Sequence, residues 1–341
     1  MKRILAIVIS TAAMTITSST ATAQDVTLRV HQMLPPQATI PSKAIAPWAE
    51  KVEKDSGGRI RIEQYPSMQL GGKPPELYDQ AKDGVVDLIW TVIGYTPGRF
   101  PKTEAFELPF MITTGEATSK AFHEFAEKHA MDEFKDVKVI GFHVHGPGLI
   151  HTKDPVNKLE DLKGMKIRGG SRVINQMLEK LEATPVGMPV PAVAEALSKG
   201  VLDGTTVPWE VTLPLKVPER VKNHTTFSGE YGLYTLTFVF AMNKAAYEKL
   251  PDDLKKVIDD NSGLEVAAAF GRAMDGGDTV GKAKTEELGN NIITLDDAET
   301  QRWKDTAAPI IDEWIADMDK KNIDGKALVE DARALVEKYS N

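Results

Sequence analysis

The sequence predicts an α/β protein with two lobes, each a mostly parallel sheet flanked by helices, and a ligand cleft between the lobes. Strand-like and helix-like segments alternate from residue 26 to residue 90, an order typical of a doubly wound parallel sheet. The same alternation returns between residues 165 and 204. In both stretches a helix ends at a glycine and a Val-x-Asp run follows, at 84–87 and 200–203. We therefore expect the two lobes to contain equivalent units that face each other.

The first lobe is expected to extend over residues 24–146. Its strands are predicted where apolar and polar residues alternate, or where a short apolar run stands between turn signals. Its helices are predicted from apolar residues at helical spacing, with Pro, Gly or Ser near their ends. The predicted strands are 26–31, 59–63, 85–90 and 137–144, and the predicted helices are 45–52, 74–82 and 122–134.

The second lobe is expected over residues 147–235, after a Gly146-Pro147-Gly148 run that crosses between the lobes. A long apolar strand, 233–242, would then return the chain to the first lobe, which residues 236–290 rejoin with a long Ala-rich helix. Residues 291–341 are predicted to be helices packed across both lobes, because their tryptophans and isoleucines form one apolar stripe. The strands predicted within the second lobe are 165–168, 186–190 and 201–204, and the helices are 173–181 and 192–198.

The first residues have the features of a secretory signal peptide. Lys2 and Arg3 precede a mostly apolar run, and Ala21-Thr22-Ala23 is a typical cleavage site. The apolar run is too short to span a membrane. We expect export to the periplasm with cleavage after Ala23, which leaves 341 − 23 = 318 residues.

Composition excludes several classes of function. The sequence has no cysteine, which excludes disulfides, thiol catalysis and zinc–thiolate sites. Its net charge of −8 becomes −8 − 2 = −10 without Lys2 and Arg3, which argues against nucleic acid as a partner. No phosphate-binding loop, dinucleotide-binding fingerprint or serine-hydrolase motif is found, so neither an enzyme nor a cofactor is predicted.

Arg168 is the strongest candidate for a ligand contact. It ends a predicted strand, just before Gly169-Gly170-Ser171 and a helix, and ligands of open α/β sheets bind at such carboxyl ends. A guanidinium matches a carboxylate with two parallel hydrogen bonds, and the free amides of Gly169 and its neighbours add donors for an anion. The alternative is that Arg168 pairs with an acidic side chain on the surface.

Aromatic residues are expected to complete the binding site. Trp90 and Trp209 follow the two Val-x-Asp runs, so both should lie near the cleft and contact the body of a small organic acid. Core burial remains the alternative for each. His31 ends the first strand, where it is either a hydrogen-bond donor to the ligand or a polar residue at a strand end. Tyr95 completes the set of expected contacts.

Three histidines suggest an alternative function. His143 and His145 would share one face of a strand, and His151 follows a few residues later. With a third ligand this arrangement is compatible with metal ligation. The alternative to a binding protein is therefore an exported, metal-dependent hydrolase that uses this cluster.

The sequence resembles the periplasmic solute-binding proteins of tripartite ATP-independent periplasmic (TRAP) transporters, in the branch typified by C4-dicarboxylate binders. The resemblance covers almost the whole mature chain, and its motifs are specific in this order after a signal peptide. The motif with the highest specificity is Leu159 to Arg168 (LEDLKGMKIR). The others are Gly57-Gly58-Arg59-Ile60, Tyr65-Pro66, Gln69-Leu70-Gly71, Asp83-Gly84 to Asp87, Leu108-Pro109-Phe110, Gly200 to Gly204, and Asn243 with Leu250-Pro251-Asp252.

The resemblance implies a type II-like periplasmic binding protein fold, no catalysis, a monomer, and a membrane permease as the partner. It also implies that Arg168 binds the substrate carboxylate. The sequence departs from the family at Thr205 to Trp209, where members often have a polar residue before the proline. It also lacks the second arginine that sialic-acid binders carry around 146–152. Both departures favour an acid with few hydroxyl groups and an apolar or aromatic body. A sulfonate or a zwitterionic osmolyte is an alternative ligand.

Overall fold

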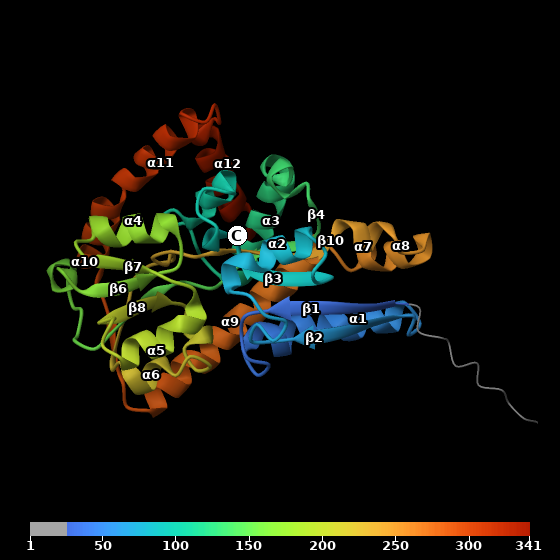
Figure 1. Cartoon of the computed structure of the whole chain (residues 1–341). Coiled ribbons are helices and arrows are strands. Elements are labelled where there is room, and N and C mark those ends of the chain that lie inside the picture. Colours follow the sequence, from blue (N-terminus) through green and yellow to red (C-terminus); the bar gives the residue numbers. More distant parts are fainter. Residues whose placement is uncertain (1–25) are drawn as a thin grey trace, which may run out of the picture.

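The computed structural model describes residues 26–341, so the expected signal peptide and its cleavage after Ala23 lie outside the described residues. Two β-sheets, each covered by helices, organise this part of the chain into two lobes (Figure 1). We call the first sheet with its helices the first lobe and the second sheet with its helices the second lobe. Across residues 26–341, no helix combines the length and the apolar character needed to cross a membrane.

The first sheet has five strands in the order β2-β1-β3-β10-β4. β10 runs antiparallel to both of its neighbours, β3 and β4, whereas β1 is parallel to β2 and to β3. β10 follows β9 of the second sheet in the sequence and lies in the first sheet. The strands are β1 (Val26–Gln32), β2 (Ile60–Tyr65), β3 (Leu88–Val92), β4 (Val137–Val144) and β10 (Thr237–Asn243).

The second sheet has six strands in the order β11-β9-β5-β8-β6-β7. Here β5 is the strand that runs antiparallel to its neighbours, so each sheet is parallel apart from one inserted strand. β11 lies in a region that was expected to be helical, and pairs in parallel with β9. The strands are β5 (Leu149–Thr152), β6 (Lys166–Gly169), β7 (Thr184–Gly187), β8 (Gly204–Val207), β9 (Asn223–Thr226) and β11 (Asn291–Thr294).

Helices cover the sheets and connect the lobes. The long helix α9 packs on α3 and β4 of the first lobe and on a short helical turn, η8 (Trp209–Val211), of the second. Near the C-terminus, α12 packs on α3, whereas α10 and α11 pack on α4 (Figure 1). The helices are α1 (Ala46–Asp55), α2 (Leu77–Lys82), α3 (Gly115–His129), α4 (Arg172–Lys180), α5 (Val193–Ser198), α6 (Val217–Arg220), α7 (Lys244–Glu248), α8 (Asp252–Asp260), α9 (Leu264–Glu287), α10 (Asp297–Ala307), α11 (Pro309–Asp319) and α12 (Gly325–Ser340).

The two Val-x-Asp runs have the same structure in both lobes. Gly84 and Gly200 adopt φ values of +74° and +71°, the left-handed conformation that ends helices α2 and α5. The valines that follow, Val85 and Val201, are 54% and 49% exposed, and their N–H groups still bond to helix carbonyls. β3 and β8 therefore start at Leu88 and Gly204, after the expected starts at residues 85 and 201.

The aspartates of the two runs have equivalent roles. Asp87 accepts a hydrogen bond from the N–H of Arg29 at 2.9 Å, and Asp203 accepts one from the N–H of Lys166 at 2.9 Å. Each carboxylate thus satisfies a backbone donor of the neighbouring strand, in the middle of β1 for Arg29 and at the start of β6 for Lys166. The sequence similarity between the two runs reflects this shared structural role.

The segment 233–236 is not part of a strand, although the sequence predicts one from residue 233. It crosses between the lobes beside residues 146–148, and the Gly148 N–H donates to the Tyr234 carbonyl at 2.9 Å. The helix expected over 122–134 begins earlier, at Gly115, because Thr114 caps it by accepting from the Ala117 N–H at 3.1 Å. It ends at His129, before a separate helical turn at 131–134.

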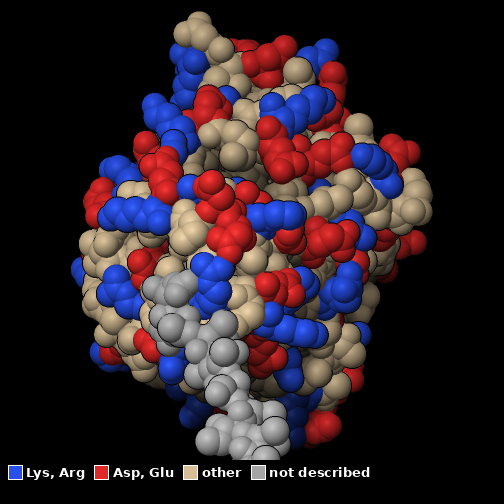
Figure 2. All heavy atoms as spheres, turned by 90° about the vertical axis from the view of Figure 1, so that its right-hand side faces the viewer, with Lys and Arg blue, Asp and Glu red and all other residues tan. Residues whose placement is uncertain are grey.

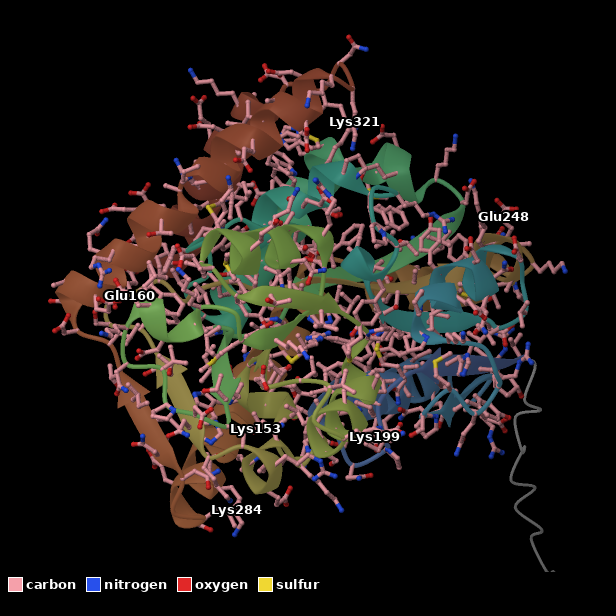
Figure 3. The ribbon with its side chains drawn as sticks, turned by 60° about the vertical axis from the view of Figure 1, so that its left-hand side comes forward. Lys153, Glu160, Lys199, Glu248, Lys284 and Lys321 are labelled. Carbon is pink, nitrogen blue, oxygen red and sulfur yellow. The ribbon has the colours of Figure 1, made fainter. Side chains whose placement is uncertain are left out.

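Charged side chains are mixed on the surface. On the face seen in Figure 2, basic and acidic residues are interspersed and no large area of one sign is visible. In Figure 3, the labelled residues Glu160, Glu248 and Lys284 lie at the outer edge of the molecule. The charges on these faces are therefore those of an ordinary solvated surface.

We expect loss of either aspartate carboxylate to destabilise the fold. Asp87→Ala and Asp203→Ala each leave a strand N–H without its partner, which should lower the free energy of unfolding by about 0.5–1.5 kcal/mol. Urea denaturation checks this, with Asp154→Ala, an exposed aspartate of the second lobe, as the control. An effect no larger than that of the control would contradict the assigned role.

Candidate ligand-binding site

A cavity lies between the carboxyl edges of the two sheets. β3 and β10 of the first lobe contribute Trp90, Val92 and Phe238, while β6 and β8 of the second lobe contribute Arg168 and Val207. Its free volume is about 30 Å³, which is room for little more than one or two water molecules. A larger ligand therefore requires the lining to move apart. The other lining residues are Met33, Leu34, Tyr95, His145, Val190, Pro208, Glu210, Val211, Tyr234 and Leu236.

Arg168 is the charged anchor of this cavity. Its side chain is buried, with only 1% of the residue exposed. Nε donates to the Met188 carbonyl at 2.9 Å, and Nη1 donates to the Thr206 carbonyl at 3.0 Å. Among residues 26–341 no carboxylate forms an ion pair with it, so the surface pairing considered from the sequence is not found. A buried charge without a counter-ion is costly, which makes this position a candidate anion site.

Two tyrosines surround the guanidinium. The Tyr95 hydroxyl lies 3.5 Å from Nη2 of Arg168 and accepts a hydrogen bond from the Val190 N–H at 2.8 Å. It therefore connects the first lobe to the second. Burial raises the pKa of both Tyr95 and Tyr234, while the nearby guanidinium lowers it in part. Both side chains remain neutral phenols at neutral pH and can donate to an anion.

A stack of rings forms the aromatic wall. The Trp90 and Phe238 rings lie 5.1 Å apart with an interplanar angle of 9°, and the His143 ring lies 4.8 Å from Phe238 at 11°. Trp90 Nε1–H donates to His143 Nε2 at 2.7 Å. Burial lowers the pKa of His143 to about 3, so its imidazole is neutral and can accept this bond. The wall is thus held in one orientation before a ligand arrives.

The three histidines do not form a metal site. His145 donates from Nδ1 to the Gly146 carbonyl at 2.5 Å and accepts from the Leu236 N–H at 3.1 Å, while burial lowers its pKa to about 3. His151 is bonded to His224 at 2.7 Å in the second lobe. In the part of the chain that the structure describes, no group of three or more His, Asp or Glu side chains is arranged to hold a metal ion. The hydrolase alternative has no support from this geometry.

Of the expected contacts, Arg168, Trp90 and Tyr95 line this cavity, and three others do not. His31 is buried outside its lining, bonded to Gln80 Oε1 at 2.7 Å and to the Leu70 N–H at 3.2 Å. The Trp209 ring packs against His151 and His224, each with ring centroids 5.3 Å away. Gly169 borders a separate surface hollow beside α4.

Glu210, Tyr234 and Phe238 line the cavity but were not expected as contacts. Glu210 is buried, which raises the pKa of its carboxyl to about 7. The sequence does not distinguish Glu210 from its neighbours: only the structure shows that Pro208 and Glu210, which flank Trp209, face the cavity while the Trp209 ring faces away. Tyr234 and Phe238 belong to an apolar stretch in which nothing distinguishes a lining residue from a core residue.

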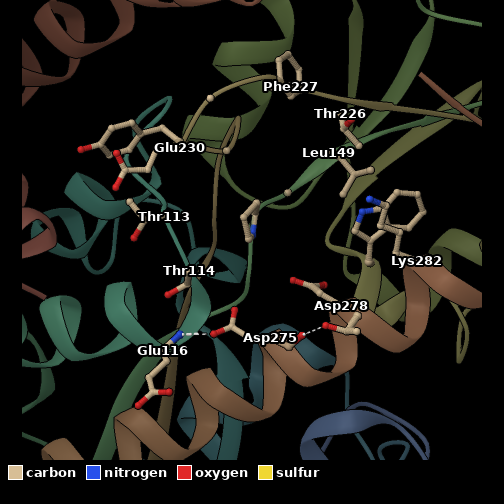
Figure 4. A pocket seen from close by; sticks show the side chains of 17 residues that line it. Thr113, Thr114, Glu116, Leu149, Thr226, Phe227, Glu230, Asp275, Asp278 and Lys282 are labelled. Atoms are coloured by element: carbon tan, nitrogen blue, oxygen red, sulfur yellow. Dashed lines mark hydrogen bonds between the residues drawn. The ribbon is translucent and has the colours of Figure 1, made fainter. Parts of the chain in front are cut away.

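A larger hollow of about 660 Å³ lies behind Trp209, between α9 and the crossing segments (Figure 4). Two of its acidic residues bind backbone N–H groups. Asp275 accepts hydrogen bonds from the N–H groups of Gly115 and Glu116 at 2.6 and 2.9 Å. Asp278 accepts one from the N–H group of Glu210 at 2.7 Å. Arg168 is not in its lining. We therefore place the candidate anion site in the smaller cavity.

Two α/β lobes with a cationic cavity between the carboxyl edges of their sheets are the architecture of a solute-binding protein. Residues 31–317 match the bacterial extracellular solute-binding proteins, family 7 (DctP), and the chain belongs to this family. The C4-dicarboxylate-binding periplasmic protein DctP of Rhodobacter capsulatus is 26% identical over 316 residues, which cover 92% of this chain and 93% of that protein.

Two solved structures are similar over almost their whole length. A TRAP solute-binding protein from Rhodoferax ferrireducens, in complex with copurified benzoate, is 49% identical with a TM-score of 0.91, covering 92% of this chain and 98% of that one. A marine-metagenome TRAP solute-binding protein specific for aromatic acid ligands was solved with 3-hydroxybenzoate. It is also 49% identical, with a TM-score of 0.92, covering 94% and 100%.

Burial of Glu210 predicts a dependence of stability on pH. Its pKa is about 7 in the fold against an ordinary value of 4.5, so the folded state holds a proton that the unfolded chain releases. This contribution to stability is full below pH 4.5 and is lost as the pH rises to about 7. Between pH 5 and 8, the wild type should lose about 1–3 kcal/mol more than Glu210→Gln. Parallel pH profiles of urea unfolding for the two ligand-free proteins would contradict this.

Trp209→Ala should act on stability and leave ligand preference unchanged. The ring is buried against two histidines, and truncation of such a residue costs about 3–5 kcal/mol. Thermal unfolding and binding of a series of organic acids check the two effects separately. A variant that melts like the wild type but ranks the acids differently would show that Trp209 contacts the ligand after all.

Proposed function

We propose that this protein captures an organic acid with an aromatic body in the periplasm and delivers it to the membrane permease of a TRAP transporter. The observation that carries the proposal is the buried Arg168 guanidinium, which has no carboxylate partner among residues 26–341. A carboxylate from solution would supply the missing charge. The family consists of transporter binding proteins, which favours a function without catalysis.

Arg168 keeps free N–H donors that can bind a carboxylate. A guanidinium has five N–H groups. Three of these N–H groups are already used. The Nε N–H bonds the Met188 carbonyl, one Nη1 N–H bonds the Thr206 carbonyl, and one Nη2 N–H faces the Tyr95 hydroxyl. One N–H on each terminal nitrogen remains, and this pair suits the two oxygens of a carboxylate. A sulfonate presents similar oxygens, so it remains a second candidate head group.

The rest of the lining suits an aromatic body. The Trp90–Phe238 stack offers a flat face, and Val92, Val207 and Leu236 add apolar surface. Benzoate and 3-hydroxybenzoate are the ligands of the two solved relatives at 49% identity, which supports an aromatic acid for this chain too. We also propose that the protein is a monomer, as the family resemblance suggests.

Arg168→Lys should abolish tight binding although it keeps the positive charge. Lysine cannot form the planar pair of hydrogen bonds, and we expect affinity for benzoate to fall by about 10-fold or more. Isothermal titration calorimetry with benzoate, 3-hydroxybenzoate and benzenesulfonate measures this and also tests the sulfonate alternative.

The control is Arg220→Lys, because Arg220 also donates to a backbone carbonyl, that of Ala194 at 2.8 Å, but does not line the cavity. This variant should bind as the wild type does. Affinity of Arg168→Lys within twofold of wild type would rule out the proposed anchor.

A further inference from the structure

We propose that Glu210 sets the ligand preference of this site, favouring aromatic acids that carry a neutral hydrogen-bonding group, such as a ring hydroxyl, over unsubstituted ones. This inference rests on the proposed function. It assigns the second polar group of the ligand, whereas Arg168 binds the first.

Glu210 is held in place by the second lobe and by α9. Its N–H donates to Asp278 of α9 at 2.7 Å, and the residue belongs to the short turn η8. A Cβ atom at Gly277 of α9 would lie only 2.7 Å from the Glu210 Cβ, so the helix backbone packs directly behind the side chain. The carboxyl therefore has no room to withdraw from the cavity that it lines.

One oxygen of this carboxyl has no partner. The residue is 5% exposed, and Oε2 is buried without a hydrogen bond among the described residues. Thr39 is the side chain that bonds the carboxyl. The lining nearest in sequence, Val207, Pro208 and Val211, is apolar. An unsatisfied buried oxygen is unfavourable, so a ligand that bonds to it is preferred to one that leaves it unpaired.

Glu210 and Arg168 act on different parts of the cavity. The guanidinium lowers the pKa of Tyr95, Tyr234 and His145, which surround it. Glu210 forms no ion pair with Arg168 among the described residues; its carboxyl is bonded to Thr39, and its charge helps to raise the pKa of the buried Asp278 carboxyl of α9. A ligand whose carboxylate is bound at Arg168 therefore reaches Glu210 with another group.

The second group of the ligand must suit a carboxyl whose pKa is about 7. A protonated carboxyl can donate to a hydroxyl or accept from it, and the ionised form accepts from it. A second carboxylate on the ligand would instead meet a buried acid, and two such charges repel each other. The site should thus prefer a hydroxylated aromatic monocarboxylate and disfavour a dicarboxylate.

The test is calorimetric binding of benzoate, its three monohydroxy isomers and phthalate to the wild type, Glu210→Gln and Glu210→Leu. The wild type should bind at least one hydroxybenzoate about tenfold or more tighter than benzoate, and phthalate more weakly than either. Glu210→Gln, which can still donate and accept, should keep most of this preference. Glu210→Leu should lose it and bind benzoate at least as tightly as the wild type does.

Glu107→Gln is the matched control. Glu107 is also buried with a pKa of about 7, but it bonds Thr237 and does not line the cavity. Its substitution should leave the preference unchanged. If Glu210→Leu does not fold, judged by circular dichroism, Glu210→Met replaces it.

The outcomes separate the two proposals. A wild type that binds none of these acids contradicts the proposed function. A wild type that binds benzoate as tightly as every hydroxybenzoate, or a Glu210→Leu or Glu210→Met variant that keeps the hydroxyl preference, overturns the role of Glu210 and leaves the proposed function standing.

Discussion

The buried guanidinium of Arg168 is the constraint on which the site depends. Removing a positive charge from water is expensive, and the carbonyls of Met188 and Thr206 compensate only part of that cost. The neighbouring groups add no second charge, because burial keeps Tyr95 a phenol and His145 a neutral imidazole. The guanidinium thus has no ionic partner among the described residues, and Glu210, the carboxyl that lines the same cavity, is kept largely protonated below its pKa of about 7 by burial. A solute-binding protein needs an unpaired cation of this kind, since a carboxylate of the chain bonded to Arg168 would compete with the ligand.

Much of the fold was predictable because its signals are local. Gly84 and Gly200 end helices in a left-handed conformation, and the Val-x-Asp runs after them identified the two equivalent units. The predicted strand starts were too early, since Val85 and Val201 still bond to helix carbonyls, a detail that an apolar run does not reveal. The close packing of α9 against the turn at Trp209 was also not predictable from the sequence. Gly281 of α9 leaves space for the Trp209 carbonyl, which a Cβ would approach to 2.2 Å, whereas the sequence shows only a small-residue helix.

The candidate site was predictable only in part. Arg168 and Trp90 end the strands predicted at 165–168 and 85–90, where both the sheet rule and the residue chemistry point to a ligand, although β3 continues to Val92. Trp209 was expected in the same cavity, but the turn after Pro208 directs its ring toward His151 and presents Glu210 to the cavity instead. The importance of Glu210 depends on an unpaired oxygen, and a missing partner is a property of the packed structure. No pattern in a sequence records it.

The position of Trp90 also provides a natural optical signal. The chain has five tryptophans, and Trp90 is the one that lines the cavity; Trp48, Trp303 and Trp314 are buried elsewhere, and Trp209 borders the other hollow. Its indole is stacked on Phe238 and bonded to His143, so these two contacts define its surroundings in the ligand-free protein. Entry of an aromatic acid would change the polarity and stacking of this one indole. Occupancy of the unlabelled protein can therefore be followed in its intrinsic emission spectrum.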